Sequence, residues 1–142
     1  MNQNSNNVFY ENIEENTIEN QNYRKVVYTG KMQFVYMSLK PLDQIHMEVH
    51  PDHDQFFRIE KGNGEAIVNG LEYKLYDGIG LIIPAGAKHQ IKNTSETEDL
   101  KLYSIYTPPE HKPDRLDVNN PDKLKQKYLK YKNKYLELSK KL

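Results

Sequence analysis

Imidazole, carboxylate and amide side chains recur at short spacing in the middle of the chain. Glu48 and His50 lie two residues apart, and Gln55 and His89 follow further along. Histidine nitrogens and carboxylate oxygens bind Fe, Mn, Ni and Zn, whereas the amide oxygen of a glutamine is a weaker donor. Side chains of these types, if the fold brings them together, could bind one divalent transition metal, whose identity these ligand types do not decide.

His46 is an alternative to Gln55 as the fourth ligand. If residues 45–50 form a strand, His46, Glu48 and His50 share one face, because side chains alternate along a strand. Alternate residues on a strand are about 7 Å apart, so one ion would not take all three. Both ligand sets remain open. His53 and His111 lie in turn-like sequence and are expected to be exposed.

The turns around these residues predict an all-β fold. Pro84-Ala85-Gly86 redirects the chain just before His89, and Asn69-Gly70 is a strong signal for a two-residue hairpin. Gly62-Asn63-Gly64 is interpreted as a second tight hairpin turn. Strands at this spacing favour an antiparallel barrel, or jelly roll, over an α/β sheet. Within it, Phe57 and Tyr106 are candidates to line a substrate pocket.

Two stretches of the sequence resemble the paired motifs of cupins. The second stretch follows the pattern G-x5-P-x-G-x2-H-x3-N at Gly78, Pro84, Gly86, His89 and Asn93. The first stretch follows its family pattern less closely. Counting back from its closing glycine, Gly62, places Gln55 where the family usually has glutamate and His50 at the second histidine. Glu48 then stands at the place of the first histidine, and Leu42 at the place of the opening glycine.

The resemblance extends over roughly residues 23–120 and is closest to the branch of small single-domain cupins labelled as mannose-6-phosphate isomerase-like. It includes the run from Tyr106 to His111, Tyr-Thr-Pro-Pro-Glu-His. It implies a cupin β-barrel with a metal pocket, in which Glu48, His50, Gln55 and His89 would bind one divalent transition metal, but it does not imply a particular reaction.

Length and composition agree with one such domain. A chain of 142 residues with 37% hydrophobic residues can bury one core. It has no cysteine, no secretion signal before the barrel and no run of 18 apolar residues, so we expect a cytoplasmic protein without a membrane span. Residues 1–22 carry four glutamates and no lysine or arginine, and we expect them to form a disordered or loosely attached arm.

The sequence after the barrel predicts a basic amphipathic helix over residues 121–142. Asn120 is a capping residue and Pro121 suits the first turn. Apolar residues then form a seam at spacings of three and four, at Leu124, Tyr128, Tyr131, Tyr135, Leu138 and Leu142. We expect this seam to dock on the barrel or on a symmetry mate. The alternative is that its eight lysines bind nucleic acid or an anionic membrane surface.

Several features argue against nucleic acid as the partner. The helix has no arginine, and residues 23–120 carry 12 basic and 14 acidic residues. We expect instead a homodimer, since unpaired strand edges favour pairing. The Lys-Tyr-rich end also resembles the carboxyl-terminal ends of giant DNA virus proteins, which would place the chain in host cytoplasm or in a virion.

The residues thus predict a metal-binding single-domain cupin. One function is a metal-dependent enzyme, of isomerase or oxygenase type, acting on a small polar or sugar-like substrate. The alternatives are a non-catalytic cupin that binds a small molecule or sugar, and a scaffold that contacts partners through its carboxyl-terminal helix.

Overall fold

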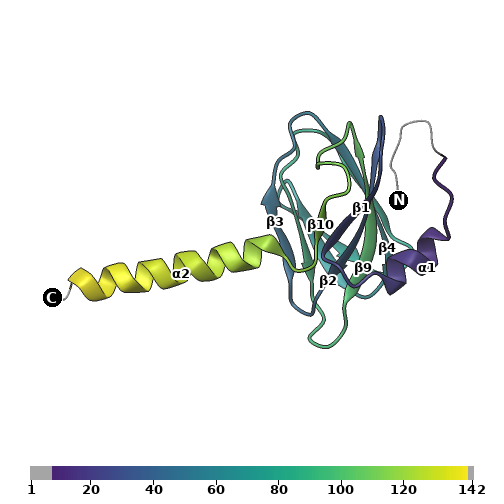
Figure 1. The fold of residues 1–142 in the computed structure, drawn as a ribbon. Coiled ribbons are helices and arrows are strands. Elements are labelled where there is room, and N and C mark those ends of the chain that lie inside the picture. Colours follow the sequence, from purple (N-terminus) through teal and green to yellow (C-terminus); the bar gives the residue numbers. More distant parts are fainter. Residues whose placement is uncertain (1–7, 141–142) are drawn as a thin grey trace.

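Two antiparallel β-sheets face each other in the computed structural model, which describes residues 8–140 (Figure 1). The larger sheet contains, in spatial order, β10 (Leu116–Asp117), β1 (Arg24–Thr29), β2 (Gln33–Leu39), β9 (Leu100–Thr107), β4 (Asp54–Lys61) and β7 (Gly80–Ile83). The smaller contains β3 (Gln44–Glu48), β8 (His89–Asn93), β5 (Gly64–Val68) and β6 (Leu71–Leu75). The predicted jelly roll is confirmed.

The core lies between the two sheets. Val35, Met37 and Leu39 alternate along β2 and are almost fully buried there, beside Leu100 and Leu102 of the neighbouring strand β9. All seven residues of β2 are buried, which ordinary alternation with a solvent-exposed face would not produce. The outer face of β2 must therefore also be covered.

Helix α1 (Ile13–Glu19) provides that cover, so the prediction of a loosely attached arm is wrong for residues 8–22; residues 1–7 lie outside the described part of the chain. Phe9 and Ile13 pack against the outer aromatic cluster that contains Phe34, and Thr17 is fully buried. The Asn12 side chain accepts a hydrogen bond from the Glu15 amide at 3.1 Å, which caps the helix. The local sequence is polar, but tertiary contacts hold it.

The two glycine-containing turns have different roles. Asn69 and Gly70 both have positive φ, 49° and 83°, and they join the paired strands β5 and β6 as predicted. Gly62-Asn63-Gly64, in contrast, connects β4 to β5, which belong to different sheets. It is a crossing between sheets and not a hairpin. A Cβ at Gly64 would lie 2.6 Å from the Lys92 carbonyl oxygen, so the close approach of β5 to β8 requires glycine there.

Helix α2 (Pro121–Lys140) projects away from the barrel (Figure 1). Its start is fixed as predicted: the buried Asn120 accepts a hydrogen bond from the Asp122 amide at 3.0 Å and donates to Asp43 Oδ1 and to the Gln44 carbonyl. Beyond this anchor, the seam does not dock on its own barrel, because Tyr131 and Tyr135 are 76% and 67% exposed.

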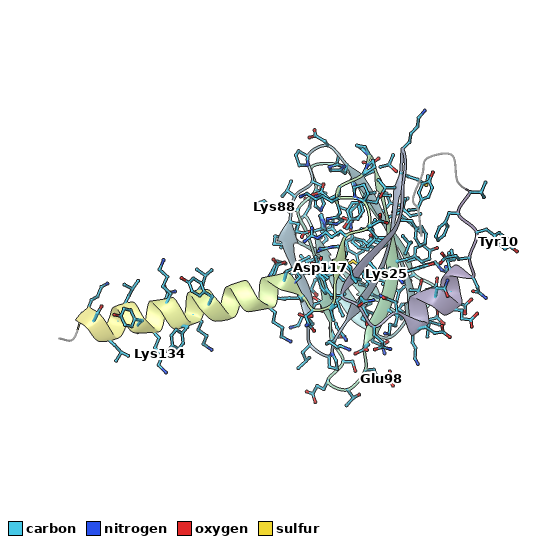
Figure 2. The ribbon with its side chains drawn as sticks, viewed as in Figure 1. Tyr10, Lys25, Lys88, Glu98, Asp117 and Lys134 are labelled. Atoms are coloured by element: carbon cyan, nitrogen blue, oxygen red, sulfur yellow. The ribbon has the colours of Figure 1, made fainter. Side chains whose placement is uncertain are left out.

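Side chains extend from all sides of α2 into open space, Lys134 among them (Figure 2). Leu142 and the side chain of Leu124 lie outside the described part of this seam. Within residues 8–140, no helix combines the length and the apolarity that crossing a membrane requires.

Candidate metal site

A bulge in β3 determines which of its side chains enter the barrel. Ile45 lies opposite Ile91 and Glu48 lies opposite His89, so three residues of β3 span the distance that two residues of β8 span. Ile45 is buried in the core at 3% exposure. The extra residue brings Glu48 to the interior face three positions later. The expectation that His46 and Glu48 share a face by regular alternation is therefore wrong.

Glu48, His50 and His89 converge at one end of the barrel interior. Glu48 Oε2 lies 3.1 Å from His50 Nε2 and 3.9 Å from His89 Nε2, and the two imidazole rings are 5.2 Å apart between centroids. One ligand atom from each of the three residues lies within 4.8 Å of the others, and His46 is not a member of this group. The spacing suits coordination of a single ion.

The turn before β8 fixes two of these residues together. The Gly86 amide donates to the His50 carbonyl oxygen at 2.9 Å, and Ala87 N donates to the Pro84 carbonyl at 3.1 Å. Gly86 has a φ of 86°, a conformation that favours glycine. His89 Nδ1 bonds the Ala87 carbonyl at 3.0 Å, which makes Nδ1 the protonated nitrogen and leaves the Nε2 lone pair facing Glu48 and His50.

Two buried polar atoms at this end of the barrel have no hydrogen-bond partner, His89 Nε2 and Gln55 Oε1. A buried acceptor left unpaired costs about 1–3 kcal/mol, so both atoms are suited to contact a cation or a hydrogen-bond donor. Gln55 is 2% exposed and lies on β4, between Ile83 and Tyr106. By alternation it shares the interior face with the core residue Phe57. These donors fit a divalent transition metal.

Protonation within the group is set by mutual contact. Burial alone would raise the pKa of Glu48, but the hydrogen bond and charge of His50 outweigh it, and the net pKa is lowered. The same hydrogen bond raises the pKa of His50. Burial lowers the pKa of His89. The directions for Glu48 and His89 favour the ionised carboxylate and the neutral imidazole that metal binding requires, whereas the raised pKa of His50 favours a proton that a bound ion would have to displace.

A loop after β9 adds residues that the motifs did not reveal. Glu110 Oε2 lies 2.7 Å from His53 Nε2, and Glu110 Oε1 lies 3.6 Å from His50 Nδ1. The expectation that His53 and His111 are exposed is wrong. His53 is held between Glu110 and the Pro108 carbonyl, and the His111 ring packs on Tyr106 at 5.1 Å.

Gln33 of β2 positions this loop. Its Oε1 accepts hydrogen bonds from the amides of Glu110 and His111, at 3.1 and 2.8 Å, and its Nε2 donates to the His111 carbonyl at 2.7 Å. Gln33 is fully buried. The only signal for these residues was the resemblance of the run from Tyr106 to His111 to the family; the contact with Gln33 spans 78 residues of sequence and leaves no local pattern.

The two predicted pocket residues differ in their surroundings. The ring of Tyr106 lies 5.9 Å from that of His50, so it borders the metal group directly. Phe57 and Tyr106 both belong to the hydrophobic core cluster, but Tyr106 also contacts the His50 and His111 rings. Asn93, the last residue of the second motif, donates to the carbonyls of Leu39, Lys40 and Glu98, and so stabilises loops rather than contributing to the site.

The sequence profile of the cupin domain matches residues 35–106, the segment from β2 through β9. The chain belongs to the cupin family. Protein L612 of Acanthamoeba polyphaga mimivirus is 43% identical to this cupin over 148 residues, covering 95% of this chain and 92% of that protein. The giant-virus resemblance of the tail therefore has a counterpart along nearly the whole chain.

Solved structures agree with this assignment. The crystal structure of BH2720 from Bacillus halodurans is 34% identical, with a TM-score of 0.77, and covers 80% of this cupin and 90% of that chain. A structure from Thermotoga maritima, described as a predicted oxalate decarboxylase, is 25% identical with a TM-score of 0.52, and covers 56% of this cupin and 69% of that chain.

Proposed function

We propose that this cupin binds one divalent transition metal, Fe, Mn, Ni or Zn, through Glu48, His50 and His89, and acts as a metal-dependent enzyme on a small polar or sugar-like molecule. The observation that supports this most directly is the buried Nε2 of His89, which has no hydrogen-bond partner and lies 3.9 Å from Glu48. Gln55 is the proposed fourth ligand, with His46 as the alternative.

The remaining residues of the site line the pocket and orient its side chains. Such a metal ion, when bound, acts as a Lewis acid on a substrate oxygen or supports oxygenase chemistry. Tyr106, almost fully buried, presents its ring and hydroxyl to the pocket. Glu110 lies between His50 and His53, where its carboxylate can accept hydrogen bonds from both imidazoles and so orient them. The loop of residues 107–111 holds Glu110 and His111 next to the site through its bonds with His53 and Gln33.

A non-catalytic cupin that binds a small molecule is the second candidate, because the same three ligands and the same buried tyrosine would serve binding alone. Turnover separates the two. The isomerase and oxygenase types need aldoses or small keto acids to be converted by the metal-loaded protein, whereas a binder would only be stabilised by them.

Metal content tests the site. Protein purified without chelators or a polyhistidine tag should contain about one metal ion per chain by elemental analysis. His50→Ala, His89→Ala and Glu48→Gln should each reduce this content at least tenfold, because removing a coordinating ligand strongly weakens binding. His53→Ala and His111→Ala are matched controls that remove imidazoles from the same pocket, and they should retain the metal.

Equal metal in all five variants would refute the site. The fourth ligand is decided by a second pair of variants. If Gln55 coordinates the ion, Gln55→Ala loses metal and His46→Ala keeps it; the reverse result would identify His46.

We also infer that the protein forms a homodimer, takes a small-molecule ligand rather than nucleic acid, and acts in the cytoplasm of an infected host or in a virion. The viral setting is supported by the relative from mimivirus, which matches 95% of this chain. The dimer is supported by the exposed apolar seam of α2, where Tyr128, Tyr131 and Leu138 are all more than half exposed.

A further inference from the structure

Arg24 is a charged residue inside the barrel that the metal group does not use. It lies opposite Met37 of β2 and Asp117 of β10, and its side chain is only 7% exposed. Met37 is a core residue, so Arg24 shares its interior face, whereas the next residue, Lys25, is exposed. A buried guanidinium is costly unless it is paired. Arg24 Nη1 meets Asp117 Oδ2 at 2.6 Å.

This pairing does not satisfy all the donors of Arg24. The same Asp117 oxygen also accepts from Arg115 Nε at 3.0 Å, so two guanidinium groups share one carboxylate. Arg24 Nε is buried without a hydrogen-bond partner, and so is the hydroxyl of Tyr23, whose ring lies 5.1 Å from the Arg24 guanidinium carbon. Two donors in the interior, one of them on a charged group, are therefore unsatisfied.

The basic cluster of Arg24, Arg115 and Asp117 adjoins the metal group. Arg115 Nη1 donates to His111 Nδ1 at 3.1 Å, and His111 Nε2 lies 3.4 Å from the Tyr106 hydroxyl. The Tyr106 ring in turn faces His50. The charge of Arg24 also acts on Glu48 and on His111. Figure 2 shows Asp117 over the barrel, close to the base of α2.

We propose that Arg24, assisted by the Tyr23 hydroxyl, binds the anionic group of the ligand that the metal site takes, so that this ligand is a small carboxylate or phosphate anion and not a neutral sugar. The proposal rests on the proposed function for the location of the ligand. A guanidinium N–H edge in a low-dielectric interior binds carboxylate or phosphate through charge-assisted hydrogen bonds, which are about twice as strong as neutral ones. A neutral hydroxyl would pair with the Arg24 Nε–H only through a weaker hydrogen bond without an anionic acceptor.

A purely structural role for Arg24, as the ion pair that holds β1 to β10, makes different predictions. Both roles are lost in Arg24→Gln. Asp117→Asn breaks the ion pair but keeps the guanidinium, so this variant separates the structural role of Arg24 from its role in binding an anion. Lys25→Gln is a matched control that removes a positive charge from the outer face of the same strand.

Calorimetric titration with pyruvate, its neutral analogue pyruvamide and inorganic phosphate tests the proposal, on metal-loaded and on chelator-treated protein whose metal content is measured. Pyruvate should bind wild type, Asp117→Asn and Lys25→Gln with similar affinity, and Arg24→Gln at least tenfold more weakly. Pyruvamide, which carries no negative charge, should bind each of these proteins more weakly than pyruvate binds the wild type. The phosphate titration shows whether the anion that binds better is a carboxylate or a phosphate.

Equal loss of pyruvate binding in Arg24→Gln and Asp117→Asn would overturn the proposal in favour of the structural role. If Arg24→Gln does not fold, Arg24→Lys replaces it. The lysine ammonium can keep the pair with Asp117 but lacks the Nε–H edge, so pyruvate should bind Arg24→Lys more weakly than it binds Asp117→Asn. Stronger binding to Arg24→Lys than to Asp117→Asn would overturn the proposal.

Failure of the proposed function would look different. Wild-type protein that holds no metal, yet binds pyruvate through Arg24, would refute the metal site alone. Metal-loaded protein that binds pyruvate no better than pyruvamide would refute the anion site alone.

Discussion

His111 shows how the basic cluster sets the charge of a single residue at the site. Burial and the nearby positive charges of Arg24 and Arg115 lower its pKa from 6.5 to about 3. Its Nδ1 accepts a hydrogen bond from Arg115, which a protonated imidazole could not do. The imidazole is therefore neutral throughout the physiological range, and His111 can donate from Nε2 toward the Tyr106 hydroxyl.

Acid should destabilise the protein partly through His111. Because its folded-state pKa is depressed, the unfolded chain binds more protons between pH 6.5 and about 3, so the stability that the neutral form provides is complete above pH 6.5 and is lost as the pH falls toward 3. In urea unfolding with a chelator present, His111→Gln should reduce the loss of stability between pH 7 and pH 5 by up to about 2 kcal/mol. An unchanged loss between these pH values would contradict the neutral assignment.

At this scale, sequence reasoning identified the side chains that converge at the candidate metal site but not their surroundings. Glu48, His50 and His89 were predictable because the two family motifs place coordinating side chains at fixed spacing. Arg24 and Glu110 have no such spacing: they come from strands and loops far away in the sequence, and only the packing of β1, β9 and β10 brings them near the site.

Among the elements, the turn before β3 keeps a conformation that its residue type disfavours. Leu42 occupies the place where the family usually has glycine, and its φ is 62°, in the left-handed region. The turn is closed by a hydrogen bond from Asp43 N to the Lys40 carbonyl, and Leu42 N bonds the Ser95 carbonyl. The side chain of Leu42 is 54% exposed, so it gains little from burial.

Leu42→Gly should therefore raise the free energy of unfolding, by about 0.5–1 kcal/mol. Relief of the left-handed strain gives about 1–2 kcal/mol, and the greater backbone entropy of glycine in the unfolded chain offsets part of it. Leu71→Gly is the matched control, since Leu71 is a similarly exposed leucine at the start of strand β6 and should lose stability. Urea unfolding of both variants provides the measurement, and equal destabilisation would contradict the strain argument.

Elements with local signals were predicted well, and those shaped by tertiary contact were not. The Asn69-Gly70 hairpin and the Asn120 cap depend on residues close in sequence. The bulge that turns Glu48 inward depends on pairing with β8, and α1 depends on the outer face of β2 and β9, including the bond from Lys101 Nζ to the Asn20 carbonyl. Neither contact leaves a periodic pattern in the sequence.

For the whole molecule, the unpartnered α2 is the feature that the barrel does not explain. The outer face of the larger sheet is already covered by Phe9 and α1, so it is not open for pairing as a bare sheet would be. Most of the stability of a helix in a protein comes from packing of its apolar face, and α2, a helix of 20 residues, leaves that face exposed. The exposed seam of Tyr128, Tyr131, Tyr135 and Leu138 therefore suits a second copy of the chain.

Sedimentation should show a dimer at micromolar protein concentration that depends on this seam. Tyr131→Ser combined with Tyr135→Ser should weaken the dimer. Lys130→Gln combined with Lys134→Gln should preserve or strengthen the dimer. The reason is that residues 121–142 carry eight lysines against two acidic residues, so two paired helices would repel each other. For the same reason added salt should strengthen the dimer. Nucleic-acid binding would respond oppositely, since phosphate contacts weaken as salt rises. A wild-type monomer, or single-stranded nucleic acid bound at physiological salt and released on removal of residues 121–142, would overturn this role for α2.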